Sequence, residues 1–116
     1  MNGNVVQEKS FDFALKIIAL YKALQLRGER VLSGQLLRAG TSIGANVEEA
    51  NAGQTRRDFL AKMAIASKEA RETRYWLRLL RESKLVEVDV AEELQQVEEL
   101  IRILTAIVKT TAVRSK

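Results

Sequence analysis

The sequence contains no proline, no cysteine and no histidine in 116 residues. The absence of proline, together with only six glycines, argues against a turn-rich all-β fold and favours a few long helices. Without cysteine, the chain has no disulfide, no thiolate nucleophile and no cysteine-ligated metal. Without histidine, it lacks the commonest general base and any Ser-His-Asp triad. These absences exclude most enzyme mechanisms, so we expect no catalytic activity, no cofactor and no metal site.

Length and composition indicate one globular domain over residues 1–116, because 47% of the residues are apolar and 29% are charged. No run of 18 uncharged apolar residues is present, so we expect no membrane span. The first ten residues, MNGNVVQEKS, lack the apolar stretch of a secretory signal. We therefore expect a cytoplasmic protein.

The net charge of +4 is unevenly distributed. Residues 55–84 carry nine basic and four acidic groups, whereas residues 85–116 carry four basic and six acidic groups. The excess of basic charge therefore lies almost entirely in one segment. Such asymmetry favours an anionic partner.

Apolar periodicity and helix-boundary residues predict four helices, over residues 10–27, 30–51, 55–83 and 89–112. Ser10 is the expected N-cap of the first helix, and Thr55 opens a capping box at the start of the third. The short connections between them are typical of antiparallel neighbours. The sequence thus predicts an all-α protein, an up-down-up-down antiparallel four-helix bundle.

The predicted helix 10–27 carries two apolar stripes on nearly opposite sides. One consists of Phe11, Leu15 and Ile18, and the other of Phe13, Ile17, Leu20 and Leu24. A helix that is apolar on two sides must be covered on two sides, which predicts a homo-oligomer unless two neighbours in the same chain cover it. Glycines four residues apart in the second helix favour close approach by another helix, such as one from a neighbouring subunit; the alternative is a local bend of the helix. The predicted oligomer interface comprises Phe13, Ile17, Leu20, Leu24, Gly40 and Gly44.

Four arginines recur at spacings of three, four and three residues in the third helix, within an arc of about 80°. These residues, Arg71, Arg74, Arg78 and Arg81, form what we call the arginine stripe. Guanidinium groups suit phosphate oxygens, so the stripe, together with Arg56 and Arg57, predicts contact with RNA or DNA. The alternative is structural: glutamates of the same helix or of helix 89–112 pair with these arginines.

A second polar group, predicted to form a structural network, comprises Arg38, Ser42, Asn46, Glu49 and Glu72. Beside the arginine stripe, Tyr75 and Trp76 are interpreted as packing anchors rather than as stacking partners for bases. An all-helical mutase using Gln35, Arg38 and Lys62 is the strongest enzymatic alternative, but no motif at matching spacing supports it.

Three stretches together are specific enough to indicate a family. They are LLRAGTSIGANVEEA at residues 36–50, FLAKMAIA at 59–66 and KEARETRYWLRLL at 68–80. The sequence resembles the bacterial four-helix-bundle proteins encoded in intervening sequences of 23S rRNA genes, which are related to the accessory variability determinant of diversity-generating retroelements. The resemblance implies a cytoplasmic bundle that assembles into a ring-like homopentamer.

In the retroelement branch, the resemblance further implies a basic ring surface that binds nucleic acid and a reverse transcriptase, whereas RNA association is the usual suggestion for the ribosomal branch. We therefore expect a non-catalytic oligomer that contacts RNA or DNA through its third helix. The alternative is a structural or adaptor oligomer that binds only protein partners.

Overall fold

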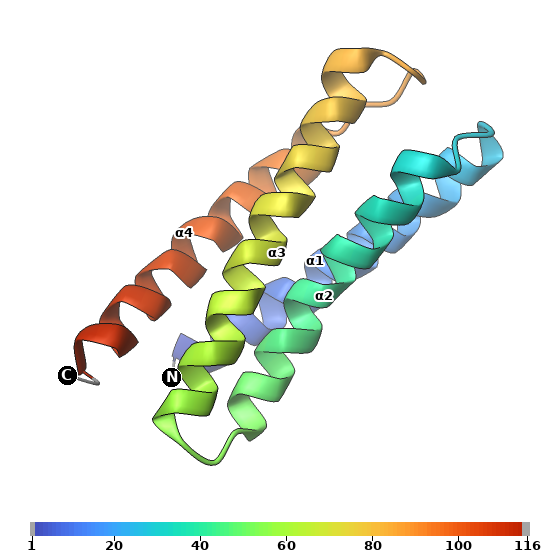
Figure 1. Cartoon of the computed structure of the whole chain (residues 1–116). Coiled ribbons are helices and arrows are strands. Elements are labelled where there is room, and N and C mark those ends of the chain that lie inside the picture. Colours follow the sequence, from blue (N-terminus) through green and yellow to red (C-terminus); the bar gives the residue numbers. More distant parts are fainter. Residues whose placement is uncertain (1, 115–116) are drawn as a thin grey trace.

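The computed structural model describes the backbone of residues 2–114 and the side chains of residues 5–114. The described chain consists of four helices and no strands: α1 (Asn2–Leu26), α2 (Val31–Ala52), α3 (Arg56–Ser83) and α4 (Ala91–Arg114). Each helix packs against the next, and α4 also contacts α1. The connection 53–55 lies at one end of the molecule, and connections 27–30 and 84–90 lie at the other (Figure 1). The all-α, four-helix prediction is therefore confirmed.

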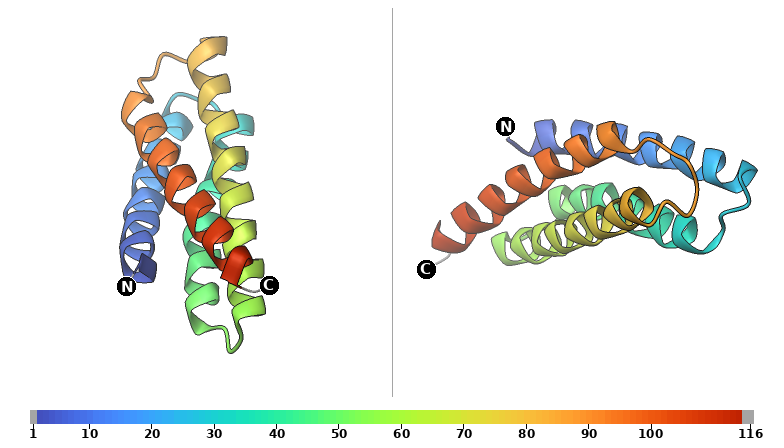
Figure 2. Two further views of the ribbon diagram at one scale, coloured as in Figure 1. Left: turned by 90° about the vertical axis from the view of Figure 1, so that its left-hand side faces the viewer. Right: turned by 90° about the horizontal axis from the view of Figure 1, so that it is seen from above.

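The four helices form an elongated body of 48 × 22 × 20 Å. In the right-hand view of Figure 2, α1 and α4 lie on one side of the molecule, and α2 and α3 lie on the other. Among the described residues, no helix is both long enough and apolar enough to cross a membrane.

Helix α1 begins eight residues before the predicted start, because Val6 extends its inward apolar stripe by one heptad and is fully buried. The predicted N-cap at Ser10 is therefore wrong. Ser10 lies inside the helix with 1% of its surface exposed, and its hydroxyl donates to the carbonyl of Gln7 at 3.2 Å.

The other three helices begin and end within two residues of the predicted positions. The Thr55 side chain accepts a hydrogen bond from the Asp58 amide, as the predicted capping box requires. Helix α3 ends at Ser83, and the next residue, Lys84, has a φ of 52°, the left-handed conformation that commonly follows a helix. In the last connection, Asp89 accepts from the Ala91 amide at 3.0 Å.

The start of α2 is held by a glutamate, Glu29, whose capping role the sequence pattern did not predict. Gly28 turns the chain with a φ of 83°, and the buried Glu29 carboxylate then accepts from the amides of Val31, Leu32 and Ser33 at 2.7–2.9 Å. Burial by itself raises the pKa of Glu29, but the hydrogen bonds from these amides outweigh it, and the pKa is lowered. Glu29 thereby accepts hydrogen bonds from amides at the helix start that have no partner within the helix.

The apolar stripe of α1 that was predicted as an oligomer interface is instead part of the core. Its side chains are at most 7% exposed in the single chain and pack in the main hydrophobic cluster; they are Phe13, Ile17, Leu20 and Leu24. Because these side chains are covered within the single chain, the prediction that they form an oligomer interface is wrong. The opposite side, which we call the outer stripe, remains exposed: Phe11 by 61%, Leu15 by 52% and Ile18 by 40%.

The two helical glycines predicted at the same interface also face α1 of their own chain. A Cβ added to Gly40 would lie 2.9 Å from Cγ2 of Ile17, and one added to Gly44 would lie 3.4 Å from the backbone carbonyl oxygen of Ser10. The close approach that these glycines permit is therefore between α1 and α2. Their assignment to a contact between subunits is wrong for that reason.

Helix α4 packs with a heptad spacing: its inward residues Leu94, Val97, Ile101 and Leu104 are buried, as is Val90 just before its start. Its contact with α1 includes two ion pairs, Lys16 with Glu92 and Lys9 with Glu99. The hydrogen bond to the Glu92 carboxylate raises the pKa of Lys16.

Candidate nucleic-acid interface

The arginine stripe lies along the groove between α3 and α4. Three of its members, Arg74, Arg78 and Arg81, line this groove together with Leu94, Gln95 and Glu98 of α4, and the groove encloses about 500 Å³. The stripe follows helical periodicity, so its four side chains emerge on one side of α3 over about 15 Å of helix length.

The arginines of the stripe have few acidic partners. Arg74 Nη1 lies 3.3 Å from Glu98 Oε1, and Arg81 Nε lies 2.7 Å from Glu82 Oε2. Arg71 donates to the neutral hydroxyl of Thr105 at 3.0 Å. Arg78 is exposed and has no hydrogen-bond or ion-pair partner among residues 5–114. The groove is therefore electropositive, with positive charge from α3 exceeding the negative charge that faces it.

The acidic side of α4 mostly faces another neighbour. Glu92 and Glu99 pair with lysines of α1, and Glu98 is the one carboxylate of α4 that lines the groove in the described part of the chain. Of the glutamates interleaved with the stripe, Glu69 and Glu72 pair across to α2. The structural ion-pair alternative thus holds for Arg74 and Arg81, whereas Arg71 and Arg78 are not paired with carboxylates in the described structure.

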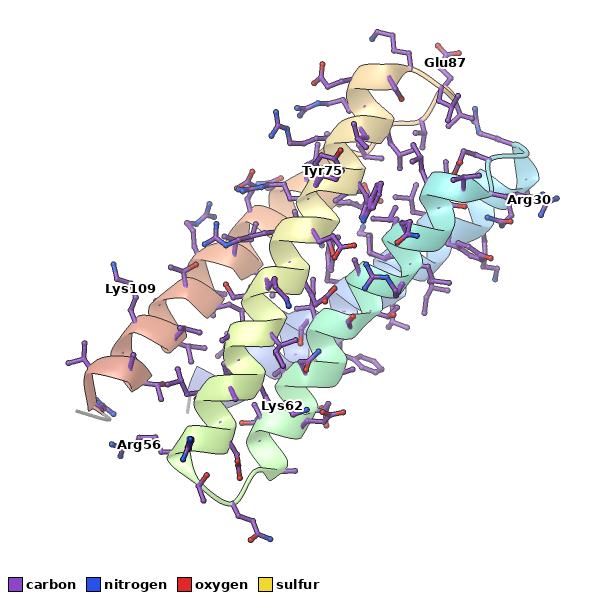
Figure 3. The ribbon with its side chains drawn as sticks, viewed as in Figure 1. Arg30, Arg56, Lys62, Tyr75, Glu87 and Lys109 are labelled. Atoms are coloured by element: carbon purple, nitrogen blue, oxygen red, sulfur yellow. The ribbon has the colours of Figure 1, made fainter. Side chains whose placement is uncertain are left out.

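The structure does not bring the two arginines at the start of α3 together with the stripe. Arg56 and Arg71 are fifteen residues apart, about 22 Å along the helix axis. Arg56 donates instead to the carbonyl of Arg114 at 3.0 Å, and Figure 3 shows it beside the turn that joins α2 to α3. Arg57 is exposed at the same end.

The predicted polar network forms only in part. Arg38 of α2 binds two glutamates of α3, Glu69 at 3.3 Å and Glu72, and the indole Nε1 of Trp76 donates to Glu72 at 3.0 Å. These contacts fasten α2 to α3 and give Glu72 two partners.

The remaining members of that predicted network lie elsewhere. Ser42 and Asn46 donate to carbonyls four residues earlier in α2, at 2.9 and 2.8 Å. Glu49 pairs with Lys62 of α3 at 2.7 Å. Their inclusion in one network was wrong because each finds a nearer partner, within its own helix or directly across the α2–α3 contact.

The two adjacent aromatic residues of α3 have different environments. Trp76 packs against the core, as predicted, whereas Tyr75 is 54% exposed. Their rings meet edge to face, with centroids 5.2 Å apart and an interplanar angle of 69°. The packing interpretation is therefore confirmed for Trp76 and wrong for Tyr75.

Acidic side chains do not gather into a metal site in the described structure, where no group of three or more could hold a metal ion. The chemistry that the site offers is charge and hydrogen-bond donation from guanidinium groups, next to one exposed aromatic ring. These are the properties of a surface for anionic ligands.

Comparison with known proteins places this architecture in a family. The crystal structure of a protein with unknown function from the S23 ribosomal protein family of Bacteroides thetaiotaomicron superimposes with a TM-score of 0.88. The two chains are 45% identical, and the match covers 94% of this chain and 99% of that one. A search of curated proteins gave no match. The family model of the 23S rRNA-intervening sequence protein matches residues 2–106, so this chain belongs to that family.

Proposed function

We propose that this protein is a non-catalytic homo-oligomer that binds RNA or DNA phosphates through the arginine stripe. The observation that carries the proposal is the imbalance of charge along the α3–α4 groove, where one α4 carboxylate, Glu98, faces a row of arginines. Guanidinium groups form short, charge-assisted hydrogen bonds to phosphate oxygens. A phosphate chain in the groove supplies the negative charge that α4 does not.

The existing contacts of the stripe are weak enough to exchange. The Arg74–Glu98 and Arg81–Glu82 pairs are partly solvent-exposed, and exposed ion pairs contribute at most about 1 kcal/mol. Arg78 has no described partner to give up. Binding of a phosphate therefore costs the protein little internal stability.

The outer stripe of α1 supports the oligomeric part of the proposal. Phe11, Leu15 and Ile18 form an exposed apolar row at spacings of four and three residues, and water contact with such a row is unfavourable. We take a second copy of the chain as its partner. The family resemblance implies a ring-like homopentamer of up-down-up-down bundles, in which five chains of net charge +4 together present +20.

Binding measured against salt concentration tests the nucleic-acid proposal. Phosphate contacts release counterions, so log K falls linearly with log salt, with a slope of about 0.7–0.9 per phosphate contacted. The double variant Arg74→Ala, Arg78→Ala should lower the magnitude of this slope by about 1.4–1.8 if each arginine contacts one phosphate. Fluorescence anisotropy with labelled oligonucleotides measures the affinity at each salt concentration, and the slope follows from these values.

The matched control removes two positive charges that lie outside the groove. Arg27 and Lys109 are both exposed, and Arg27→Ala, Lys109→Ala should leave the salt slope nearly unchanged. No detectable binding to RNA or DNA at about 50 mM salt would overturn the proposal and favour an adaptor oligomer that binds only protein. Equal effects of the two double variants would also overturn the role of the stripe.

Light scattering after size exclusion tests the oligomer. We expect a mass several times that of the 13.0 kDa chain, reduced to the single-chain mass by Leu15→Glu, because a charge buried in an apolar contact is strongly unfavourable. Val113→Glu is the control, since Val113 is 71% exposed and lies on α4. A single-chain mass for the unmodified protein contradicts the proposal.

A further inference from the structure

The exposed ring of Tyr75 is held in place by a chain of contacts that begins in α2. Arg38 binds Glu72, Glu72 accepts from the indole of Trp76, and the Trp76 ring meets the Tyr75 ring edge to face. Trp76 is itself packed against the core. Although Tyr75 is 54% exposed, one side of its ring packs against Trp76, which fixes its position on the surface.

The position of Tyr75 on α3 relates it to the arginine stripe. Residues three and four apart on a helix are neighbours, so Tyr75 stands beside Arg71 on one side and Arg78 on the other. These are the two stripe arginines that have no carboxylate partner in the described structure. Figure 3 shows Tyr75 in the half of α3 that lies away from the α2–α3 turn, which is the half that carries the stripe.

An aromatic ring beside guanidinium groups has a known use in proteins that bind single-stranded nucleic acids. The phosphates follow the positive charges, and a base stacks on the ring, which is tolerant of sequence because every base has a π-face. In a duplex the bases are paired and stacked on one another, so they do not offer a face to a side chain on a helix surface. A ring in this position therefore makes no stacking contribution to the binding of a duplex.

We infer that the ligand of the arginine stripe is a single-stranded nucleic acid, and that one of its bases stacks on Tyr75 while its phosphates contact Arg71 and Arg78. This inference rests on the proposed function and specifies the class of nucleic acid. It assigns Tyr75 a binding role, and it gives the Arg38–Glu72–Trp76 contacts the role of positioning that ring.

The test compares two labelled ligands of equal length and sequence composition, an unstructured oligonucleotide and a blunt hairpin duplex, at about 50 mM salt. Tyr75→Leu should weaken binding of the single strand by roughly 5- to 150-fold, the range expected for loss of one stacked base. Duplex binding and the salt slope should not change, because no charge is removed. Tyr75→Phe keeps the ring and should bind the single strand like the unmodified protein.

The only tryptophan of the chain provides a second readout. The ring centroids of Trp76 and Tyr75 are 5.2 Å apart. A base stacked on Tyr75 should therefore change the fluorescence of Trp76, whereas binding of the hairpin should leave that fluorescence unchanged. Because Tyr75 is largely exposed, Tyr75→Leu should fold normally, which unchanged duplex binding confirms within the same experiment.

The outcomes separate this inference from the proposed function. If Arg74→Ala, Arg78→Ala lowers the salt slope but Tyr75→Leu leaves single-strand binding unchanged, the stacking inference is wrong and the phosphate contact stands. Equal affinity for the two ligands, with equal effects of every variant, also overturns the inference. If neither ligand binds, both proposals fail.

Discussion

The contact between α1 and α2 is closely packed, whereas the contact between α3 and α4 leaves a groove at the surface. In the first, Gly40 and Gly44 allow α1 to approach closely, and Ile17 fills the space that a side chain would occupy. In the second, long arginine side chains line a groove of about 500 Å³. The first contact is close at its glycines, whereas the second leaves room for a groove lined by positive charge.

Under the proposed function, this difference assigns stability to the α1–α2 contact and anion binding to the α3–α4 groove. Close packing contributes through many apolar contacts that depend on shape. Exposed arginines contribute little to folding but much to the attraction of an anion. Substitutions in the α1–α2 contact should therefore change the free energy of unfolding and leave binding nearly unchanged. Substitutions in the α3–α4 groove should change binding and leave the free energy of unfolding nearly unchanged.

The largest expected effect comes from two glycine-to-alanine substitutions in the same helix. A Cβ at Gly34 meets no atom within 4 Å, whereas one at Gly40 meets Ile17 at 2.9 Å. Gly34→Ala should raise the free energy of unfolding by up to about 1 kcal/mol because alanine favours helix. Gly40→Ala should be less stable than Gly34→Ala by about 1–3 kcal/mol, the cost of overpacking.

Chemical denaturation of the two variants measures this difference directly. The gain from helix propensity is common to both, so the difference reports the crowding against Ile17 alone. If both variants gain stability equally, the α1–α2 contact is not closely packed, and the contrast with the α3–α4 groove is lost.

Periodicity predicted most of the fold because α2, α3 and α4 each have one apolar side. Helix α1 has two, and the choice between Phe13 and Phe11 as the inward residue depends on the glycines of α2, which lie in another helix. Ser10 was misplaced for a related reason. A serine suits a helix N-cap, but the buried Val6 lies one heptad before Phe13 and continues the helix past it.

The candidate site was predicted in position but not in its pairings. The spacing of Arg71, Arg74, Arg78 and Arg81 places them on one side of α3 whatever the neighbours are. The register between neighbouring helices determines which arginines lie next to a carboxylate. In this structure, that register places Glu72 beside Arg38 of α2, with which it forms an ion pair. The adjacent residues Tyr75 and Trp76 differ by about 100° around the helix, so one faces solvent and the other faces inward.

The two connections at one end of the bundle differ in what their glutamates contact. Glu29 caps α2 through three backbone amides, whereas Glu87 of the α3–α4 connection is exposed. Glu29→Gln should lower the free energy of unfolding at pH 7 by up to about 2 kcal/mol, the upper range for loss of a cap. Glu87→Gln should change it by less than about 0.5 kcal/mol.

The pH dependence has a defined sign. The pKa of Glu29 is lowered in the folded state from an ordinary value of 4.5, so its charge stabilises the fold above that value. This stabilisation is lost as the pH falls below 4.5 and through the folded pKa. The difference between the unmodified protein and Glu29→Gln, measured by denaturation from pH 7 to pH 3, should therefore shrink toward acid. A difference that is independent of pH contradicts the capping role of the carboxylate.

The smallest expected change in stability belongs to the groove itself. Glu98→Gln removes the carboxylate that faces Arg74 at 3.3 Å, and because the pair is exposed, unfolding should change by less than about 0.5 kcal/mol. Affinity for an oligonucleotide should instead rise by up to about fivefold, since Arg74 is released to the ligand. Glu92→Gln is the matched control: it removes the same charge from α4, but on the side where Glu92 pairs with Lys16 of α1. An equal rise in affinity for both variants means that binding follows net charge alone, and then the groove has no special role.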